Sequence, residues 1–482
     1  MAPRRTDHAR TQNGDAQRRR RADAEANADR VLEAATELLL AEPDASLEEI
    51  AAAAQVSRAT VYRHFGSRTR LVEATRRDAR RRADANETDT LRPPGELAGG
   101  PTPLDVADVL NKVPPHLLGD QIVSEAQRLA GVTSVALYLI DIDGTHLLRL
   151  AGSEEFPAAL RAPLAVGPEL PREGLPGVRE LIDRELPGSV LAPLFLRGRA
   201  VGLLLAVDAP EEPLLALARQ AAASISLAES YTDVFDAVRR RKETSAAAEI
   251  QQNLLPPRLA RISGALLAGN VLPGYEIGGD WFDYIENRDG AWLGVADSMG
   301  RGTTAAALGA VALGAFRARR KHTASLEDAA TAIHHTIEQL EVDGAFVNVI
   351  LARWHGPSSL FTWITCGCQA PVLIGADGSV AELPGARHEG LGLGEHARAF
   401  SCNRRRLEPG ERLLLVSDGV LERRTEDGGQ FGLDGVRAAV QGIDGSVAAP
   451  TVRALEDALT DASADPLEDD ATIVVLARSR PR

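Results

Sequence analysis

The first hydrophobic pattern in the chain is helical. Apolar residues recur at intervals of three and four and therefore share one helical face: Val31, Leu32, Ala35, Leu38 and Leu39. Ser46 and Glu49 predict an N-terminal capping box for a second helix, Leu47 to Ala54. Ser57 is then predicted to cap a third helix, which runs from Arg58 to Phe65. This part of the sequence predicts a small all-α domain.

Two polar stretches flank this all-α segment, which spans residues 23–84. Residues 1–22 contain seven arginines and two aspartates, and their composition predicts a disordered basic arm. Residues 85–104 are rich in proline and glycine and predict a linker.

The pattern then changes to strands of period two. A helix from Leu117 to Leu129 precedes a β-rich run, Ser134 to Asp141, and Asp143-Gly144 predicts a hairpin turn into His146 to Ala151. Two further strands and a closing helix follow, the strands at Ser189 to Leu196 and Ala200 to Val207. The order α-β-β-α-β-β-α predicts an α+β domain over residues 105–227.

A long helix from Leu214 to Leu254 is predicted next, ended by Pro256-Pro257. Four apolar residues in it keep a 4-3-4 spacing: Leu227, Tyr231, Val234 and Val238. This spacing is typical of a two-stranded seam and predicts a homodimer through a signalling helix, residues 228–258. A single helix packed on its own domain would give the same pattern.

The last domain, residues 259–477, alternates short strands and helices and precedes a tail at 478–482. It contains four acidic motifs: G-G-D-W-F-D from Gly278, A-D-S-M-G-R-G from Ala296, S-D-G-V from Ser417 and E-D-D-A-T from Glu468. Three of them adjoin the predicted strands Trp292 to Ala296, Arg412 to Val416 and Thr472 to Leu476. Aspartates from distant segments can therefore converge at sheet edges. Such a cluster favours a hard cation, Mg²⁺ or Mn²⁺, and two such ions can activate a water against a phosphoryl group.

Composition narrows the class of protein. The chain has 482 residues, is 44% hydrophobic and 25% charged, and so predicts folded domains. No apolar run is long enough for a membrane span, no signal peptide is visible, and three cysteines fit a reducing cytoplasm. No lysine stands in a phosphate-binding loop, which excludes the commonest ATPase class. The net charge of −14 argues against general nucleic-acid coating, while the basic arm leaves a local DNA-binding module open.

The acidic motifs, with Glu249-Ile-Gln-Gln-Asn-Leu-Leu-Pro256 before them, resemble the PPM family of metal-dependent serine/threonine phosphatases, in its bacterial SpoIIE-like branch. The resemblance implies an α/β sandwich of two central β-sheets flanked by helices. It also implies two Mn²⁺ or Mg²⁺ ions, with Asp297 bridging both and the backbone carbonyl of Ser298 serving the second. The remaining implied carboxylate ligands are Asp280, Asp418 and Asp469, and Asp283 and Asp470 are weaker candidates.

The chain departs from the family pattern at two positions. Arg301 stands where the family commonly has the histidine of M-G-H-G, and Cys368 where it has that of A-G-H-x-P. Neither histidine is a metal ligand in the family, so the chemistry is expected to survive. A cysteine phosphatase is excluded, because no cysteine is followed by arginine six residues later. Cys366, Cys368 and Cys402 are expected to be small packing residues.

The all-α segment resembles the TetR-type helix-turn-helix, on Ser46-Leu-Glu-Glu-Ile-Ala51 and Val56-Ser-Arg-Ala-Thr-Val-Tyr-Arg-His-Phe65. The resemblance implies that Val56 and Val61 pack the turn and that duplex DNA is bound in the major groove. The residues implied to face the groove are Arg58, Ala59, Thr60, Tyr62, Arg63 and His64. A helical module retained for protein contacts is the alternative.

The middle domain resembles a GAF domain in topology. It contains no cysteine, which excludes covalent bilin attachment and leaves a small-ligand sensor or a dimerisation spacer. Together the segments predict a cytoplasmic phosphoprotein phosphatase, and the resemblance implies a phosphorylated anti-sigma-factor antagonist as substrate. The competing prediction is a DNA-binding regulator whose phosphatase-like domain only senses or scaffolds. The intact set of four aspartates favours the enzyme.

Overall fold

The computed structural model describes residues 30–31, 34–35, 46–65, 71, 75, 103–161, 165–274, 278–322, 325–394 and 399–479. The chain forms two compact units, Met1–Leu97 and Ala98–Arg482, and each is described by itself. Within the described ranges, no helix is both long enough and apolar enough to cross a bilayer.

The first unit contains α2 (Leu47–Ala53) and α3 (Arg58–Phe65), as the sequence predicts. Ser46 and Glu49 form the expected capping box, and the Ser57 hydroxyl accepts the Thr60 amide N–H at 3.2 Å. Val61 is fully buried against Ile50 and Val31, and Val56 packs beside them. These contacts fix the angle between the two helices. The predicted basic arm, and all but the last two residues of the predicted linker, lie outside the described residues.

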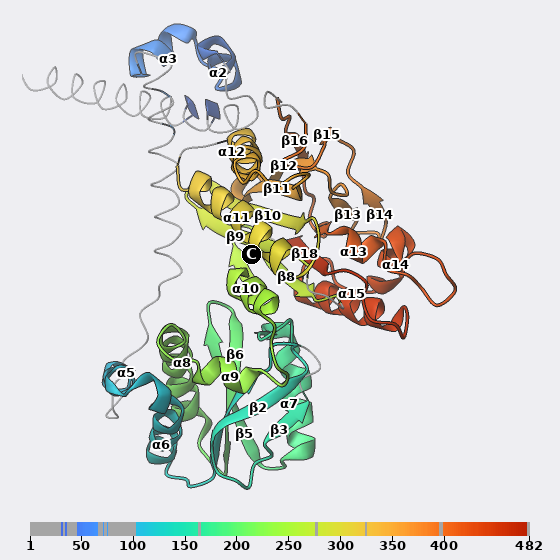
Figure 1. Cartoon of the computed structure of the whole chain (residues 1–482). Helices are drawn as coiled ribbons and strands as arrows, with labels where there is room; N and C mark the ends of the chain where they lie inside the picture. Colours follow the sequence, from blue (N-terminus) through green and yellow to red (C-terminus); the bar gives the residue numbers. More distant parts are fainter. Residues whose placement is uncertain are drawn as a thin grey trace, which may run out of the picture. The chain divides into compact units, whose positions relative to one another are not determined.

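The second unit begins with an α+β region whose main elements follow the predicted order, with an extra first helix and two extra short strands that were not predicted (Figure 1). Its helices are α5 (Pro103–Lys112), α6 (Leu118–Ala130), α7 (Leu175–Glu185) and α8 (Glu211–Ala228), with the short 3₁₀ turns η1 (Pro115–Leu117) and η2 (Arg172–Gly174). Its strands are β1 (Val135–Ile140), β2 (His146–Gly152), β3 (Ala159–Arg161), β4 (Leu170–Pro171), β5 (Ser189–Leu196) and β6 (Arg199–Val207). They form one sheet, in which β6 pairs with β1, β4 and β5.

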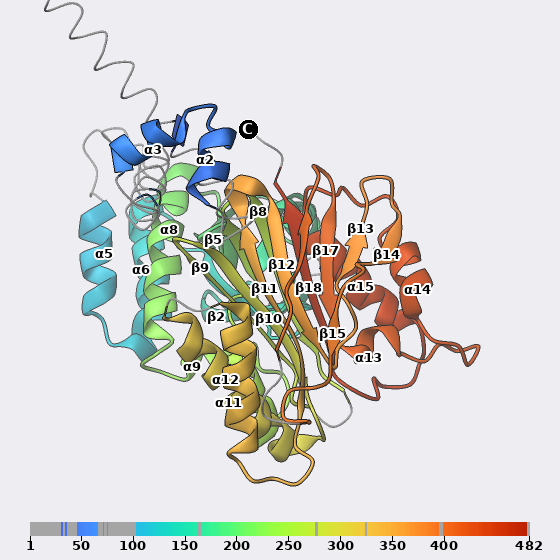
Figure 2. The ribbon, with the colours of Figure 1, turned by 90° about the horizontal axis from the view of Figure 1, so that it is seen from above.

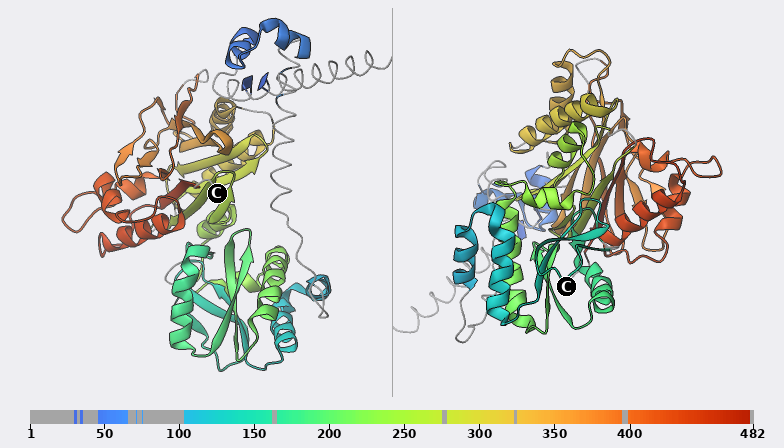
Figure 3. Two further views of the ribbon diagram at one scale, coloured as in Figure 1. Left: turned by 180° about the vertical axis from the view of Figure 1, so that it is seen from behind. Right: turned by 60° about the horizontal axis from the view of Figure 1, so that its bottom comes forward.

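Strand β1 shows why this sheet is covered on both faces. All six of its residues are buried, and successive side chains point to opposite sides. Val135, Leu137 and Leu139 join the core formed with α6 and α8. The alternate residues, Tyr138 among them, join the core formed with α7. Helices therefore lie on both faces of the sheet (Figure 3).

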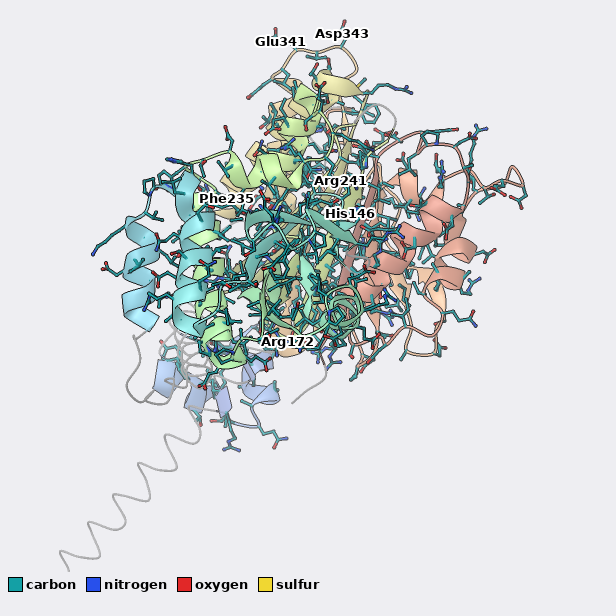
Figure 4. All side chains as sticks on the ribbon, turned by 90° about the horizontal axis from the view of Figure 1, so that it is seen from below. His146, Arg172, Phe235, Arg241, Glu341 and Asp343 are labelled. Atoms are coloured by element: carbon teal, nitrogen blue, oxygen red, sulfur yellow. The ribbon has the colours of Figure 1, made fainter. Side chains whose placement is uncertain are left out.

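The predicted long helix from Leu214 to Leu254 is wrong. It is three helices: α8, which ends at Ala228, α9 (Val234–Arg239) and α10 (Ala246–Leu254). Tyr231 lies between helices and is 79% exposed, so the 4-3-4 spacing does not run along one helical face. Phe235 is instead buried in the core of the α+β region, which holds α9 against the sheet. Just beyond α9, Arg241 meets the ring of His146 from β2, with 2.8 Å between Nη1 and Nδ1 (Figure 4).

Two further sheets make up the rest of the second unit. The first has strands β9 (Trp281–Asn287), β10 (Gly290–Ser298), β11 (Val347–His355), β12 (Leu360–Cys366), β15 (Arg387–His388) and β16 (Asn403–Arg406). The second has β7 (Leu259–Ile262), β8 (Ala265–Leu272), β13 (Val372–Ile374), β14 (Val380–Glu382), β17 (Arg412–Val416) and β18 (Ala471–Arg478). The helices are α11 (Gly302–Arg320), α12 (Leu326–Glu338), α13 (Asp418–Leu421), α14 (Gly432–Ala439) and α15 (Ala449–Asp461), with the 3₁₀ turn η3 (Gly356–Ser358).

The two sheets stack face to face between layers of helices (Figure 2). The two faces of strand β10 contact different layers. Leu293 and Val295 lie in the core between the sheets, while Trp292 and Ala296 pack toward α11 and α12. On the other side, α15 packs Leu455 against the second sheet. The predicted sandwich of two central sheets flanked by helices is confirmed.

Candidate metal centre and catalytic site

The four predicted carboxylates come from four places in the sandwich. Asp297 lies near the end of β10, and Asp280 directly precedes β9 on the neighbouring strand. Asp418 is the first residue of α13, immediately after β17, and Asp469 precedes β18. Because β17 and β18 are paired and the two sheets are stacked, their ends bring these segments together.

The electrostatics of the site show that the carboxylates act on one another. Burial raises the pKa of Asp280 well above its usual value, and the nearby charge of Asp297 raises it further. Burial, followed by the charges of Asp418 and Asp469, raises the pKa of Asp297 to about 6. The pKa of Asp418 is raised by burial and then by Asp469. The largest charge contributions to these three groups thus all come from other carboxylates.

A divalent cation fits the chemistry of this donor set. Carboxylate oxygens are hard ligands, and a cation relieves the repulsion that raises their pKa values. Among the described residues, no three His, Cys, Asp or Glu side chains are grouped closely enough to hold one ion as they stand. The predicted carboxylates are thus close enough for their charges to interact, but no three of them converge on a single point.

The glycines of the G-G-D motif permit close packing beside the site. A Cβ atom on Gly279 would lie 2.5 Å from the Ala305 carbonyl oxygen and 2.5 Å from the Ser298 Cβ atom, which no real Cβ tolerates. A Cβ on Gly278 would approach a carboxylate oxygen of Asp470 at 3.1 Å. Only glycine lets this segment lie against β10 and α11, and this packing brings Asp280 close to Asp297 and Asp470.

Several neutral side chains that were quoted in motifs, but not assigned a role, hold the acidic residues in place. The Thr472 hydroxyl donates to Asp280 Oδ2 at 2.6 Å. Gln251 of α10, 2% exposed, donates through Nε2 to Asp470 Oδ2 at 2.6 Å and to the Asp280 carbonyl oxygen at 3.1 Å. Asp470 also accepts the amide N–H groups of Gly274 and Gly278, at 2.8 and 3.0 Å. Asp470 is therefore satisfied by three donors and orients its neighbours.

Asn348 was not found from the sequence at all. It stands opposite Asp297 in the antiparallel register of β10 and β11, and its Nδ2 lies 3.3 Å from Asp297 Oδ2. Fifty-one positions separate the two residues, and no motif surrounds Asn348. Only the strand register reveals the pair.

Asp283, the other weaker candidate for a metal ligand, forms ion pairs with two arginines instead. Arg317 Nε lies 3.1 Å and Arg320 Nη1 2.5 Å from its Oδ2 atom, and both arginines come from α11. A carboxylate neutralised by two guanidinium groups is a poor metal ligand. Asp283 instead ties β9 to α11.

The two departures from the family pattern differ in environment. Cys368 lies close enough to Asp297 and Asp280 for their charges to act on its thiol, although burial is the larger cause that raises its pKa well above the usual value. This thiol is protonated at neutral pH and is no nucleophile. Arg301 is exposed at the residue before α11, between Gly300 and Gly302, both with positive φ.

The predicted DNA-recognition residues lie on α3. Arg58 is exposed and forms an ion pair with Glu48, and the Tyr62 side chain is 61% exposed. The Thr60 hydroxyl lies 2.8 Å from that of Ser57 at the start of the helix. The side chains of Ala59, Arg63 and His64 lie outside the described part of the structure.

Two family models match the chain, and they cover the helix-turn-helix motifs and three of the four acidic motifs. Residues 287–479 match the family model "Stage II sporulation protein E (SpoIIE)", and residues 31–75 match "Bacterial regulatory proteins, tetR family". The chain is also similar to the phosphoserine phosphatase RsbU of Bacillus subtilis (strain 168). That similarity is 23% identity over 240 residues, which cover 49% of this chain and 70% of that protein.

Two solved structures resemble the chain. The RsbU and RsbW domains of a Mycobacterium tuberculosis protein match with 24% identity and a TM-score of 0.40, over 47% of this chain and 64% of that one. The structure of RsbX in complex with magnesium matches with 16% identity and a TM-score of 0.35, over 46% of this chain and 98% of that one. The assignment of the two domains rests on the two family models and on the similarity to RsbU.

The chain thus combines a tetR-type helix-turn-helix region with a phosphatase domain of the SpoIIE kind. The prediction that it is a phosphoprotein phosphatase is confirmed by these matches. The GAF resemblance of residues 105–227 stays a prediction.

Proposed function

We propose that the chain is a metal-dependent serine/threonine phosphatase that acts on a phosphorylated regulatory protein. The observation that carries this proposal is the placement of Asp280, Asp297 and Asp418 at the ends of neighbouring paired strands, where burial and acidic neighbours raise the pKa of each. A protein maintains such a cluster at a cost in stability, and a bound cation offsets that cost.

Two Mn²⁺ or Mg²⁺ ions would be held by the carboxylates of Asp280, Asp297, Asp418 and Asp469 and by the backbone carbonyl of Ser298. When bound, these ions supply an activated water and neutralise the phosphoryl oxygens. The chain's own residues position the ligands. Asn348 orients Asp297 across the strand pair. Thr472 donates to the carboxylate of Asp280, and Gln251 donates to its backbone carbonyl. Deep burial keeps bulk water away from Asp280.

The substrate class follows from the resemblance to SpoIIE-like phosphatases and from the named activity of the RsbU relative. We propose a phosphoserine or phosphothreonine on an anti-sigma-factor antagonist or a similar cytoplasmic regulator. The net charge of −14 repels an acidic partner at long range. Such a partner would therefore have to be recognised by a local surface near the acidic cluster.

We propose DNA binding as a second function. The tetR-family match and the exposed face of α3, with Arg58 and Tyr62, support it. The α+β region would then be a GAF-like sensor of a small ligand. A sheet covered by helices on both faces supports that assignment. Homodimerisation, which lets a helix-turn-helix protein span two half-sites, completes the proposal.

The decisive experiment measures hydrolysis of a phosphoserine peptide by the full chain, with Mn²⁺, with Mg²⁺ and with EDTA. We expect turnover with either metal and none in EDTA. Turnover that persists in EDTA would contradict a metal-dependent enzyme. Absence of turnover under every metal condition, with Mn²⁺ binding intact, would favour the scaffold alternative.

A further inference from the structure

A cavity of about 380 Å³ lies where the α+β region meets the segment that leads into the phosphatase sandwich. Both parts belong to the second compact unit. Its walls come from β6, α8 and α9 on one side and from α10 with the following residues, Leu255 to Arg258, on the other. Helix α10 lies between the two regions (Figure 1). The volume falls in the range of small-molecule sites and is far larger than one water needs.

Four arginines line this cavity, and three of them are neutralised by acids that also line it. Arg199 pairs with Glu169 at 2.9 Å, Arg239 with Glu229 at 2.5 Å and Arg240 with Asp236 at 2.6 Å. The fourth, Arg258, forms no ion pair among the described residues. Its Nη1 and Nη2 groups donate to the carbonyl oxygen of Pro256 and to Gln252 Oε1, at 3.0 and 2.8 Å.

Arg258 is nevertheless a buried cation, with 5% of its surface exposed. The charges of Glu169 and Glu456 act on it, but neither carboxylate pairs with it. Glu169 already serves Arg199 and the amide N–H of Leu259, at 2.9 and 2.8 Å. Glu456 accepts from Asn270 at 2.6 Å and pairs with Arg453 at 3.3 Å. The Arg258 guanidinium also lies 5.8 Å from the ring centroid of Phe282, a weak contact at that distance. A buried guanidinium with only neutral hydrogen-bond partners is costly unless an anion joins it.

The unsatisfied atoms of the cavity point to the same kind of ligand. The Nε atoms of Arg239 and Arg258 are buried and have no hydrogen-bond partner among the described residues. The Nε atom of Arg199 is close to Glu169 but poorly aligned for a hydrogen bond. Every unsatisfied side-chain atom in the described lining is thus an N–H donor, and none is an acceptor. A ligand that satisfies them must bring acceptor oxygens.

We propose that this cavity binds a small anion rich in acceptor oxygens, a carboxylate or a phosphate ester, with Arg258 and Arg239 as its main contacts. Guanidinium groups suit both chemistries, because their fixed fork of donors matches carboxylate and phosphate oxygens. The site lies at the junction of the two regions and not inside the α+β region alone, so it is distinct from a sensor pocket within that domain.

The cavity is linked to the acidic cluster through helix α10. Arg258 donates to Gln252 on α10, and the preceding residue, Gln251, donates to Asp470 in the acidic cluster. An anion that draws the Arg258 guanidinium toward the cavity competes with Gln252 for its donors. Occupancy therefore acts on the same helix that holds Asp470.

Binding is tested by titration calorimetry on the full chain after its metal has been removed with EDTA and the EDTA has been dialysed away. Neither a catalytic metal nor a second polycarboxylate then competes with the probes. Inorganic phosphate and citrate are the two probes, and the one bound more tightly identifies the ligand chemistry. We expect saturable binding of at least one probe at a single site. Arg258→Gln and Arg239→Gln should each weaken it by about tenfold or more, the usual effect of losing a charged hydrogen bond.

Arg219→Gln is the matched control, because Arg219 is an exposed residue of α8 that does not line the cavity. It should leave the affinity unchanged. Lack of saturable binding of either probe would overturn the proposal, as would equal affinity in both cavity variants or an equal loss in the control. Thermal melting verifies folding, and Arg239→Gln decides the question if Arg258→Gln does not fold. Because no turnover is measured, the outcome is independent of the phosphatase proposal.

Discussion

The Nε2 atom of Gln251 lies 2.6 Å from Oδ2 of Asp470, although 219 positions separate the two residues in the chain. Gln251 sits on α10, the last helix before the sandwich, and Asp470 adjoins the predicted ligand Asp469. Asp470 is 1% exposed, so this hydrogen bond is made away from water. The helix that enters the phosphatase domain is thereby in direct contact with its acidic cluster.

Replacing Gln251 by alanine tests this contact. We expect phosphopeptide turnover to fall by roughly 10- to 100-fold, the range in which residues that orient metal ligands act. Asp470 keeps its two amide donors, so the domain should still fold. The matched control is Ala246→Ser, an exposed residue of the same helix that does not line the cavity, which should retain full activity. Equal rates in the two variants would show that the Gln251 contact does not position the site.

Asp297→Asn should be the most damaging substitution in the acidic cluster. It removes the charge assigned to both metals while keeping the size of the side chain, so the loss should exceed roughly 100-fold. Asp280→Asn, Asp418→Asn and Asp469→Asn should also impair turnover. Mn²⁺ binding by calorimetry, measured beside activity, should weaken in each. Asp343→Asn, in an exposed loop, is the control. Unchanged Mn²⁺ affinity in Asp297→Asn would refute the ligand assignment.

Replacing Cys366, Cys368 or Cys402 by serine should leave turnover within about threefold of the parent. Burial raises the pKa of both Cys368 and Cys402, the latter to about 12, so neither is a thiolate at neutral pH. The measurement is the initial rate with saturating Mn²⁺, together with a melting curve. A variant that melts normally but has lost all activity would point to thiol chemistry instead.

Glu456 gives the second unit a pH-dependent stability. Burial raises its pKa from 4.5 to about 7, while Asn270 donates to its Oε1 atom at 2.6 Å. The folded state therefore holds this proton more tightly than the unfolded chain, and stability falls as pH rises from about 4.5 to about 7. Glu456→Gln removes the penalty. It should raise the free energy of unfolding by up to about 3 kcal/mol near pH 8 and by little near pH 5.

Urea unfolding at the two pH values measures this difference. Asp461→Asn is the control, because this carboxylate is exposed at the last position of the same helix, α15. It should change stability by less than about 1 kcal/mol at either pH. A Glu456→Gln gain that is the same at pH 5 and pH 8 would contradict the raised pKa.

Arg58→Ala should weaken DNA binding and reduce the dependence of the affinity on salt concentration. If Arg58 neutralises one phosphate, its loss flattens the slope of log affinity against log salt by about 0.9. The measurement is a series of mobility shifts with the full chain and genomic fragments at several salt concentrations. Arg219→Ala, an exposed arginine of the second unit, should leave the slope unchanged. No shift of any fragment at low salt would count against a DNA-binding role.

The sequence by itself determined the local elements and the identity of the acidic residues. The capping box at Ser46 and Glu49, and the apolar strand before Asp418, depend on neighbours a few positions away, and periodicity reports such neighbours directly. The four aspartates stand in short acidic motifs, three of them beside a predicted strand, and the resemblance to the PPM family implied their role as ligands. The long helix was predicted wrongly, because helical spacing alone did not reveal that Phe235 packs into a distant core.

Tertiary structure decided the contacts between distant segments. Asn348 meets Asp297 only through the register of β10 and β11, and Asp283 is withdrawn from the acidic cluster only because α11 presents Arg317 and Arg320 to it. The buried Arg258, with its neutral partners, is likewise invisible in the sequence. The reason is physical: strand register, burial and ion pairing depend on which surfaces pack together, and packing joins residues irrespective of their separation along the chain.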